Sequence, residues 1–173
     1  PMIYVNDVGE EVVKTRRGEE PFSNMFDDLN VRLDEMDDHG VATGVLSLWG
    51  PHQWIERLPI NESLPAVQIF NDSVSAVCKA SPGRFLAYAS LPLADINAAA
   101  TELRRAMELP GVIGAIVPGN AFMSLKDTEA YQPLLAEANH LNAALFIHWG
   151  PRAGDDWPRT SPKTDNFVRR MGT

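Results

Sequence analysis

Short β-favouring runs alternate with longer segments of helical periodicity, and this alternation constrains the fold more than any other feature of the sequence. Apolar residues recur at every third or fourth position in four segments: residues 25–38, 62–80, 95–109 and 127–141. Each segment is followed by a mostly apolar run: residues 41–48, 84–91, 112–117 and 143–148. Strands that alternate with helices of this length predict βαβ units around a parallel sheet, an α/β fold.

Both ends of the chain are less clearly patterned. We expect a short strand at Pro1–Val5 and a charged, turn-like segment at Glu10–Glu20. Near the other end, Lys163–Met171 is expected to form a short helix. The length of the chain suggests that residues 1–173 form one domain.

Loop lengths distinguish the two edges of the predicted sheet. The helix-to-strand connections are short and turn-rich, as at His39-Gly40 and Pro110-Gly111. Three strand-to-helix connections are long: Trp49–Asn61, Pro118–Lys126 and Trp149–Pro162. In parallel α/β folds the carboxyl ends of the strands carry the binding site, so we expect the site among these long loops.

Charge and cysteine content exclude several classes of function. The formal net charge of −8, from 15 Lys+Arg and 23 Asp+Glu, argues against nucleic acid or an anionic membrane as a partner. No run approaches the roughly 18 apolar residues that span a bilayer, and no basic-then-apolar leader opens the sequence. Cys78 is the single cysteine, so we expect no disulfide framework, no cysteine-based zinc site and a cytoplasmic location.

His148 is the histidine with the most informative position. It ends the predicted strand at 143–148, so its imidazole is expected at the carboxyl edge of the sheet. Two interpretations stay open: a core histidine bonded to a backbone carbonyl, or a metal ligand or general base. The sequence has no His-x-His, His-Glu-x-x-His or Cys-x-x-Cys motif, so it does not supply a complete metal site by itself. His52 is expected to be a solvated loop residue, and His39 and His140 end helices.

The loop after His148 offers candidates for substrate binding. Arg152 and Arg159 can grip a carboxylate with their guanidinium groups, and Trp149 and Trp157 can stack on an aromatic ring. The alternative is a solvated loop with internal Arg–Asp pairs. Asn120 is a further candidate, although Gly119-Asn120 is more typical of a turn than of a phosphate cradle.

Five short stretches, taken together and in this order, resemble the amidohydrolase-related family of metal-dependent (β/α)8 barrels. They are residues 33–41 (LDEMDDHGV), 82–85 (PGRF), 91–95 (LPLAD), 109–114 (LPGVIG) and 145–148 (LFIH). The family includes aminocarboxymuconate-semialdehyde decarboxylase and γ-resorcylate decarboxylase. The resemblance extends from residue 25 to residue 173.

The resemblance implies a barrel whose mouth holds one divalent metal, usually zinc, with His148 in the position of the histidine ligand that ends strand five. A His-x-His ending strand one, a histidine of strand six and an aspartate of strand eight complete the site in the family. The implied substrate is a small carboxylic acid. The implied reaction is either non-oxidative decarboxylation of an unsaturated or aromatic acid, or hydrolysis of a C–N or C–O bond.

Compared with the family pattern, the sequence contains strands two to five and lacks the first strand and the C-terminal half. A complete barrel needs about 250 residues. We therefore expect a partial (β/α)8 TIM barrel that is a fragment of a longer enzyme, with an intact mass well above that of the 173 residues. In such a fragment the metal can be absent, and the exposed sheet edges favour a homo-oligomer.

Two other interpretations stay open. In the first, the chain is a folded, non-catalytic half barrel that only self-associates. In the second, Pro1-Met2-Ile3-Tyr4-Val5 resembles the start of the tautomerase superfamily, in which an N-terminal proline amine is the base. The strand–helix pattern fits those small domains badly.

Overall fold

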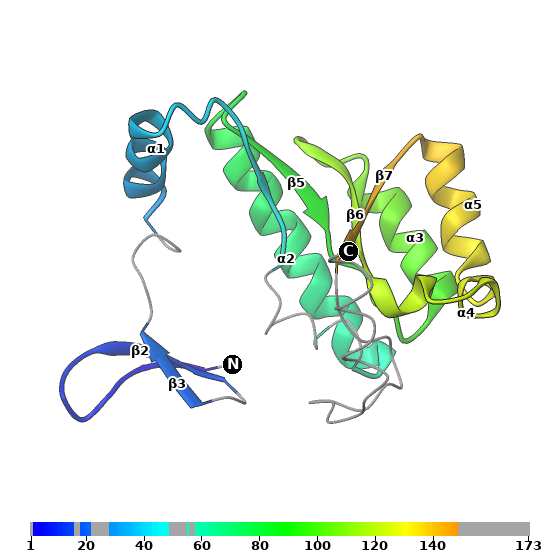
Figure 1. Cartoon of the computed structure of the whole chain (residues 1–173), viewed down its shortest axis with the longest axis horizontal. Coiled ribbons are helices and arrows are strands. Elements are labelled where there is room, and N and C mark those ends of the chain that lie inside the picture. Colours follow the sequence, from blue (N-terminus) through cyan, green and yellow to red (C-terminus); the bar gives the residue numbers. More distant parts are fainter. Residues whose placement is uncertain (1, 16–17, 22–27, 49–54, 56–57, 149–173) are drawn as a thin grey trace. The chain divides into compact units, whose positions relative to one another are not determined.

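Figure 1 shows a computed structural model of the chain, which describes residues 2–15, 18–21, 28–48, 55 and 58–148. The chain divides into two compact units, Pro1–Gly44 and Val45–Thr173, and each is described by itself. The single domain expected over residues 1–173 remains a prediction.

The first unit contains a three-stranded antiparallel sheet. Its strands are β1 (Met2–Val5), β2 (Glu11–Thr15) and β3 (Gly18–Pro21), in the order β1-β2-β3. The strand expected at Pro1–Val5 is confirmed. The turn-like segment expected at Glu10–Glu20 is wrong, because most of that segment forms β2 and β3.

Side-chain hydrogen bonds in the turn and across the sheet accompany the pairing of these charged strands. In the turn between β1 and β2, the Asn6 side-chain oxygen accepts from the backbone N–H of Val8 (3.1 Å) and of Glu10 (2.9 Å). The hydroxyl of Tyr4 donates to the carboxylate of Glu19 on β3, and this bond raises the pKa of Tyr4. The charged side chains therefore lie on an exposed part of this three-stranded sheet, where they do not prevent the strands from pairing.

The helix predicted at 25–38 is present as α1 (Leu29–Asp38), with residues 25–27 outside the described part. The Asp28 side chain caps it by accepting from two backbone N–H groups of the first turn. The predicted stop at Gly40 is confirmed, since this glycine has a φ of +67°. Met36 is the buried residue of the predicted apolar face.

The second unit is built on a curled four-stranded parallel sheet (Figure 1). Its strands are, in spatial order, β4 (Gly44–Leu46), β5 (Phe85–Ala89), β6 (Val112–Pro118) and β7 (Ala144–His148). This confirms the predicted partial barrel. The strand predicted at 41–48 is shorter than expected, and it is not buried on both faces, because Val45 is 47% exposed.

Helices follow the strands as predicted. They are α2 (Ile60–Ala80), α3 (Ile96–Ala106), α4 (Leu125–Glu129) and α5 (Gln132–Leu141). The single helix expected at 127–141 is therefore split into α4 and α5. Pro133 explains the break, because proline lacks a backbone N–H and its ring clashes with the carbonyl four residues earlier.

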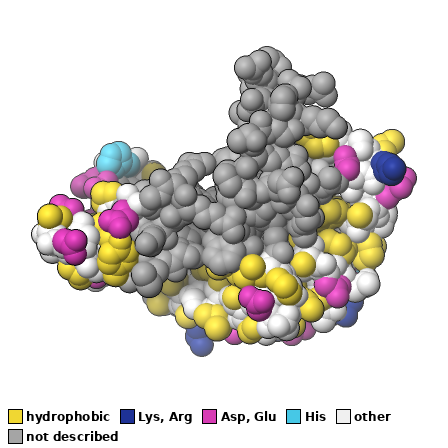
Figure 2. Space-filling model, turned by 90° about the horizontal axis from the view of Figure 1, so that it is seen from below, with side chains coloured by type: hydrophobic (Ala, Val, Ile, Leu, Met, Phe, Trp, Pro, Cys, Tyr) yellow, Lys and Arg dark blue, Asp and Glu magenta, His cyan; other side chains and the backbone are white. Residues whose placement is uncertain are grey.

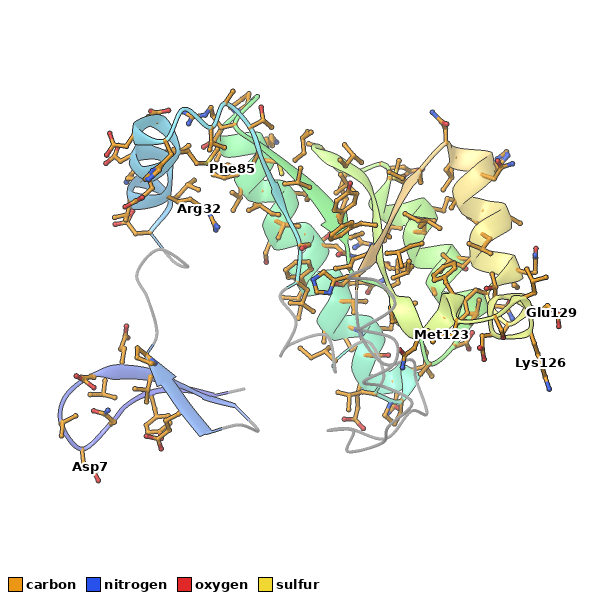
Figure 3. The ribbon with its side chains drawn as sticks, in the orientation of Figure 1. Asp7, Arg32, Phe85, Met123, Lys126 and Glu129 are labelled. Carbon is orange, nitrogen blue, oxygen red and sulfur yellow. The ribbon has the colours of Figure 1, made fainter. Side chains whose placement is uncertain are left out.

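Helices α2, α3 and α5 form one layer against the sheet, and their buried faces make the core. Phe85, at the start of β5 beside α2, is 2% exposed (Figure 3). The buried face of α2 differs from the predicted one: Phe70, Val74 and Val77 are only half-buried. The residues of α2 that are buried share a helical stripe with several polar members: Ser63, Val67, Asn71, Ser75 and Cys78.

The turn between α3 and β6 packs closely on the end of α2. The Ser75 hydroxyl donates to the carbonyl of Pro110 at 2.9 Å. Gly111 has a φ of +81°, and a Cβ at this position would collide with the side chain of Cys78. Only glycine therefore fits both the backbone conformation and the space at this turn.

Charged and hydrophobic side chains are mixed on the described surface (Figure 2). None of the described helices is long and apolar enough to cross a membrane. On the face seen in Figure 2, the Lys and Arg side chains lie apart from one another among acidic and hydrophobic ones.

Candidate functional site

Two predicted site residues lie at the carboxyl ends of neighbouring strands. Pro118, the last residue of β6, pairs in register with His148, the last residue of β7. Asn120 follows in the short 3-10 helix η3 (Gly119–Phe122) and is 7% exposed. The structure therefore brings Asn120 and His148 to one edge of the sheet, the edge where parallel α/β proteins carry their sites.

Beyond η3 the chain moves away from this edge through an exposed segment. Met123 is 40% exposed, and Lys126 and Glu129 of α4 point outward (Figure 3). The Ser124 side chain caps α4 by accepting from the backbone N–H of Asp127. We therefore limit the candidate site to the strand ends and the first residues of η3.

The half-buried side chain of His148 contacts an aromatic ring of its own strand. The imidazole meets the ring of Phe146 at a centroid distance of 5.7 Å and an interplanar angle of 71°. Phe146 in turn stacks on Tyr88 of β5, with centroids 5.3 Å apart and an angle of 17°. Tyr88, Phe146 and His148 thus form a column of three contacting rings, and the last ring lies at the carboxyl edge of the sheet.

A buried polar cluster, made up of Asn71, Ser90, Glu102 and Arg105, holds the carboxyl end of β5. Asn71 accepts from the backbone N–H of Ser90 (2.8 Å) and donates to its carbonyl oxygen (3.0 Å). Asn71 also donates to Glu102 at 2.8 Å, and Glu102 takes two bonds of 2.8 Å from the guanidinium of Arg105. The cluster ties α2 and α3 to the point where β5 ends.

The charges of this cluster are compensated. Glu102 is 2% exposed, and a carboxylate at such a site is tolerated only when it is paired and hydrogen-bonded. Hydrogen bonds to Glu102, with a further bond to Asp72, raise the pKa of Arg105 despite its partial burial. The hydrogen bonds between Arg105 and its two carboxylate partners give the cluster a structural role beside the site.

Sequence reasoning missed this cluster. The available signal was the spacing of Ser63, Asn71 and Ser75, which share a helical face with Val67 and Cys78. Polar residues in line with apolar ones indicate a buried polar contact, but the sequence does not name the partner. Ser63 and Ser90 add buried hydroxyl oxygens that have no hydrogen-bond partner among the described residues.

The remaining predicted site residues lie outside the described part of the chain. These are Trp149, Arg152, Trp157 and Arg159, with the loop at 149–162 and the helix expected at Lys163–Met171. The same holds for His52. Their roles remain predictions.

The other two histidines end helices, as expected. His39 is the C-terminal cap of α1, and its Nδ1 lies 2.8 Å from the carbonyl oxygen of Glu35. His140 is exposed in the last turn of α5 and helps to lower the pKa of Glu137, although the main cause is the hydrogen bond from Arg104. Both positions suit structural roles near helix ends.

The described residues fit a metal site only in part. His148 supplies an imidazole at the carboxyl edge, which is a suitable position for a ligand. Within the described ranges, however, no group of three or more His, Cys, Asp or Glu side chains could hold a metal ion. A metal at this edge would therefore need ligands from other parts of the protein.

The parallel sheet, its helical layer and the histidine at its carboxyl edge define a partial (β/α) barrel with a site at the strand ends. Comparison with known proteins specifies this class further. The chain is 32% identical over 136 residues to γ-resorcylate decarboxylase of Rhodococcus jostii, covering 73% of the chain and 41% of that protein. It is 32% identical over 137 residues to 2-amino-3-carboxymuconate-6-semialdehyde decarboxylase of Dictyostelium discoideum, covering 75% and 36%.

Solved structures give the same result. The crystal structure of 2,6-dihydroxybenzoate decarboxylase from Rhizobium matches with a TM-score of 0.64 and 32% identity, covering 80% of the chain and 43% of that protein. The dihydroxybenzoic acid decarboxylase of Polaromonas sp. JS666, with bound manganese and the inhibitor 2-nitroresorcinol, matches with a TM-score of 0.62 and 24% identity. The match covers 83% of this chain and 42% of that protein. At 24% identity it supports the fold alone.

These matches confirm the resemblance to the amidohydrolase-related decarboxylases. No protein-family model matches the chain. The chain spans between 36% and 43% of the length of the four proteins described above.

Proposed function

We propose that the chain is part of a metal-dependent decarboxylase that acts on an aromatic carboxylic acid. The observation that carries this proposal is the position of His148, at the carboxyl end of β7 in a partial barrel. The similarity to named decarboxylases favours decarboxylation over the hydrolysis that the sequence also allowed. One divalent metal is part of the proposal.

In this proposal His148 binds the metal through one ring nitrogen, as a neutral imidazole. The metal, when bound, supplies positive charge that polarises the oxygen atoms of a coordinated substrate. Both zinc, expected from the sequence, and manganese, which the Polaromonas structure contains, are candidates for this metal. The remaining ligands are assigned to residues outside the described part of the chain.

Substrate binding is assigned to the long connections at the carboxyl edge. We propose that Arg152 and Arg159 bind the carboxylate, and that Trp149 and Trp157 contact the ring. We propose that Asn120, in η3 after the end of β6, hydrogen-bonds a polar ring substituent. A structure of 2,6-dihydroxybenzoate decarboxylase complexed with 2,6-dihydroxybenzoate supports this substrate class.

Location and assembly are also proposed. We propose a cytoplasmic location, as the single cysteine led us to expect. Phe146 and Ile147 of β7, 41% and 43% exposed, suggest that further structure covers this strand. We propose that a remainder of the barrel, and in addition a second copy of the chain in a homo-oligomer, provide this cover.

The experiment is to incubate the intact protein with 2,6-dihydroxybenzoate labelled at the carboxyl carbon and to measure the labelled CO2 released. We expect release with added Mn²⁺ or Zn²⁺ and none after the metal has been removed with a chelator. Hydrolysis of an aryl amide in the same preparation, without CO2 from any aromatic acid offered, would favour the hydrolase. Absence of both activities, together with self-association, would favour the non-catalytic half barrel.

A further inference from the structure

The ring column made up of Tyr88, Phe146 and His148 depends on a gap in the sheet face. Tyr88 pairs in register with Gly114 of β6, and Gly114 pairs with Ala144 of β7. Paired residues point to the same face of a sheet, so the glycine, which has no side chain, leaves open space on that face between β5 and β7. Tyr88 and Phe146 meet across that space, with ring centroids 5.3 Å apart.

Gly114 has a second reason to lack a side chain. A Cβ on this residue would collide with the backbone carbonyl group of Ala144. Phe146 itself pairs with Ile116, two residues beyond Gly114, so the rings of Tyr88 and Phe146 meet diagonally across β6, beside this close approach of β6 and β7.

Phe146 also contacts the imidazole of His148. The two residues are separated by one position on β7, so their side chains project from the same face. The ring of Phe146 meets the imidazole at 5.7 Å and 71°, an edge-to-face contact, and Phe146 also stacks on Tyr88. A change in the orientation of the imidazole would therefore alter its contact with Phe146, which is itself packed against Tyr88.

We propose that Phe146, supported by Tyr88, is a positioning residue that orients the His148 imidazole for metal binding. This inference rests on the proposed function, in which His148 is a metal ligand. The groups that orient a metal-binding histidine typically change metal affinity by 10- to 100-fold when they are removed. These groups are usually polar; here the orientation comes from packing against a stacked aromatic pair.

The strand offers a matched control for this proposal. Ile147 is 43% exposed and Phe146 is 41% exposed, so the two neighbouring apolar side chains are exposed to a similar degree. Ile147 lies between Phe146 and His148 and projects from the opposite face of β7. A structural effect of trimming the strand should appear in both variants, whereas an orienting effect should appear only at Phe146.

The test measures Mn²⁺ affinity in the intact protein by competition with a metal-binding dye, alongside the EPR spectrum of the bound Mn²⁺. Phe146→Leu should weaken Mn²⁺ binding about tenfold and broaden the spectrum, because the ring that contacts His148 is lost. Leucine keeps an apolar side chain of comparable bulk at this position. Phe146→Tyr should restore both to the parent values. Ile147→Ala should leave both unchanged, and Tyr88→Leu should weaken binding by a smaller factor than Phe146→Leu.

The outcomes separate the two claims. If His148→Ala binds Mn²⁺ as tightly as the parent, the proposed ligand is wrong and the positioning role fails with it. If His148→Ala loses the metal while Phe146→Leu and Ile147→Ala have the same affinity, the ligand stands and the positioning role is overturned. If Phe146→Leu does not fold, Tyr88→Leu decides the question, and parent-like affinity and EPR in that variant overturn the role.

Discussion

Asn71 of α2 bonds twice to the backbone of Ser90, at the point where β5 has just ended. Its side-chain oxygen accepts from the Ser90 N–H at 2.8 Å, and its side-chain nitrogen donates to the Ser90 carbonyl at 3.0 Å. The side-chain amide of Asn71 therefore satisfies the backbone N–H and carbonyl of Ser90, as a neighbouring strand would do, just beyond the last residue of β5. This contact connects the helical layer to the edge of the sheet that carries the candidate site.

Replacing Asn71 by alanine should lower the free energy of unfolding by about 3 kcal/mol, because a backbone N–H and a carbonyl at a buried position lose their partner. Urea unfolding followed by circular dichroism measures this change. Ser73→Ala, on the exposed side of the same helix, should cost no more than about 0.5 kcal/mol. Equal effects of the two substitutions would contradict the role assigned to Asn71.

Ser90→Ala should leave stability unchanged or raise it slightly. The Ser90 side chain is fully buried, and its hydroxyl oxygen has no hydrogen-bond partner, so removing it removes an uncompensated polar group. The backbone bonds to Asn71 remain in this variant. A loss of more than about 1 kcal/mol in urea unfolding would mean that the hydroxyl has a partner.

Gly111→Ala should destabilise the protein much more than Gly83→Ala. Both glycines have a positive φ, +81° and +78°, so both substitutions strain the backbone by about 1 kcal/mol. A Cβ at Gly83 meets nothing within 4 Å, whereas one at Gly111 collides with Cys78. We expect Gly111→Ala to cost roughly 2 kcal/mol more, measured by thermal or urea unfolding. Similar costs would show that the turn can move away from α2.

The ion pair between Arg104 and Glu137 should make stability depend on pH in the acid range. Arg104 donates two hydrogen bonds to Glu137, which lowers the pKa of that carboxyl. A carboxyl with a lowered pKa in the folded state contributes stability above its unfolded pKa of about 4.3, and loses it as the pH falls through the folded value.

The stability difference between the parent and Glu137→Gln should therefore be constant near neutral pH and shrink on acidification below about pH 4. Repeating the comparison in an Arg104→Gln background isolates the pair. In that background the substitution at Glu137 should have a smaller effect with little pH dependence. An equally steep pH dependence in both backgrounds would assign the effect to another partner of Glu137.

The sequence predicted most of the second unit correctly because its helices and strands follow local rules. Asp95 caps α3 as expected, with bonds from Asn97 and Ala98, and Asn142 ends α5 in the left-handed conformation. His148 was placed at the end of a strand from the apolar run before it. Each of these predictions depends only on residues close in sequence.

The errors arise where distant residues decide the structure. β2 and β3 are charged, and they are strands because they pair with each other and with β1. The buried face of α2 includes Asn71 because its partners, Ser90 and Glu102, come from later in the chain. Periodicity alone places such a residue on a face but cannot supply the partner that makes its burial favourable.

The position of the metal is the most direct test of the account. Crystals of the intact protein grown with Mn²⁺ would reveal the ion by its anomalous scattering. We predict one strong peak at the carboxyl edge of the sheet, about 2.1 Å from a ring nitrogen of His148. A bound Mn²⁺ elsewhere in the protein, with His148 bonded only to protein groups, would contradict the central claim that this strand end carries a metal ligand.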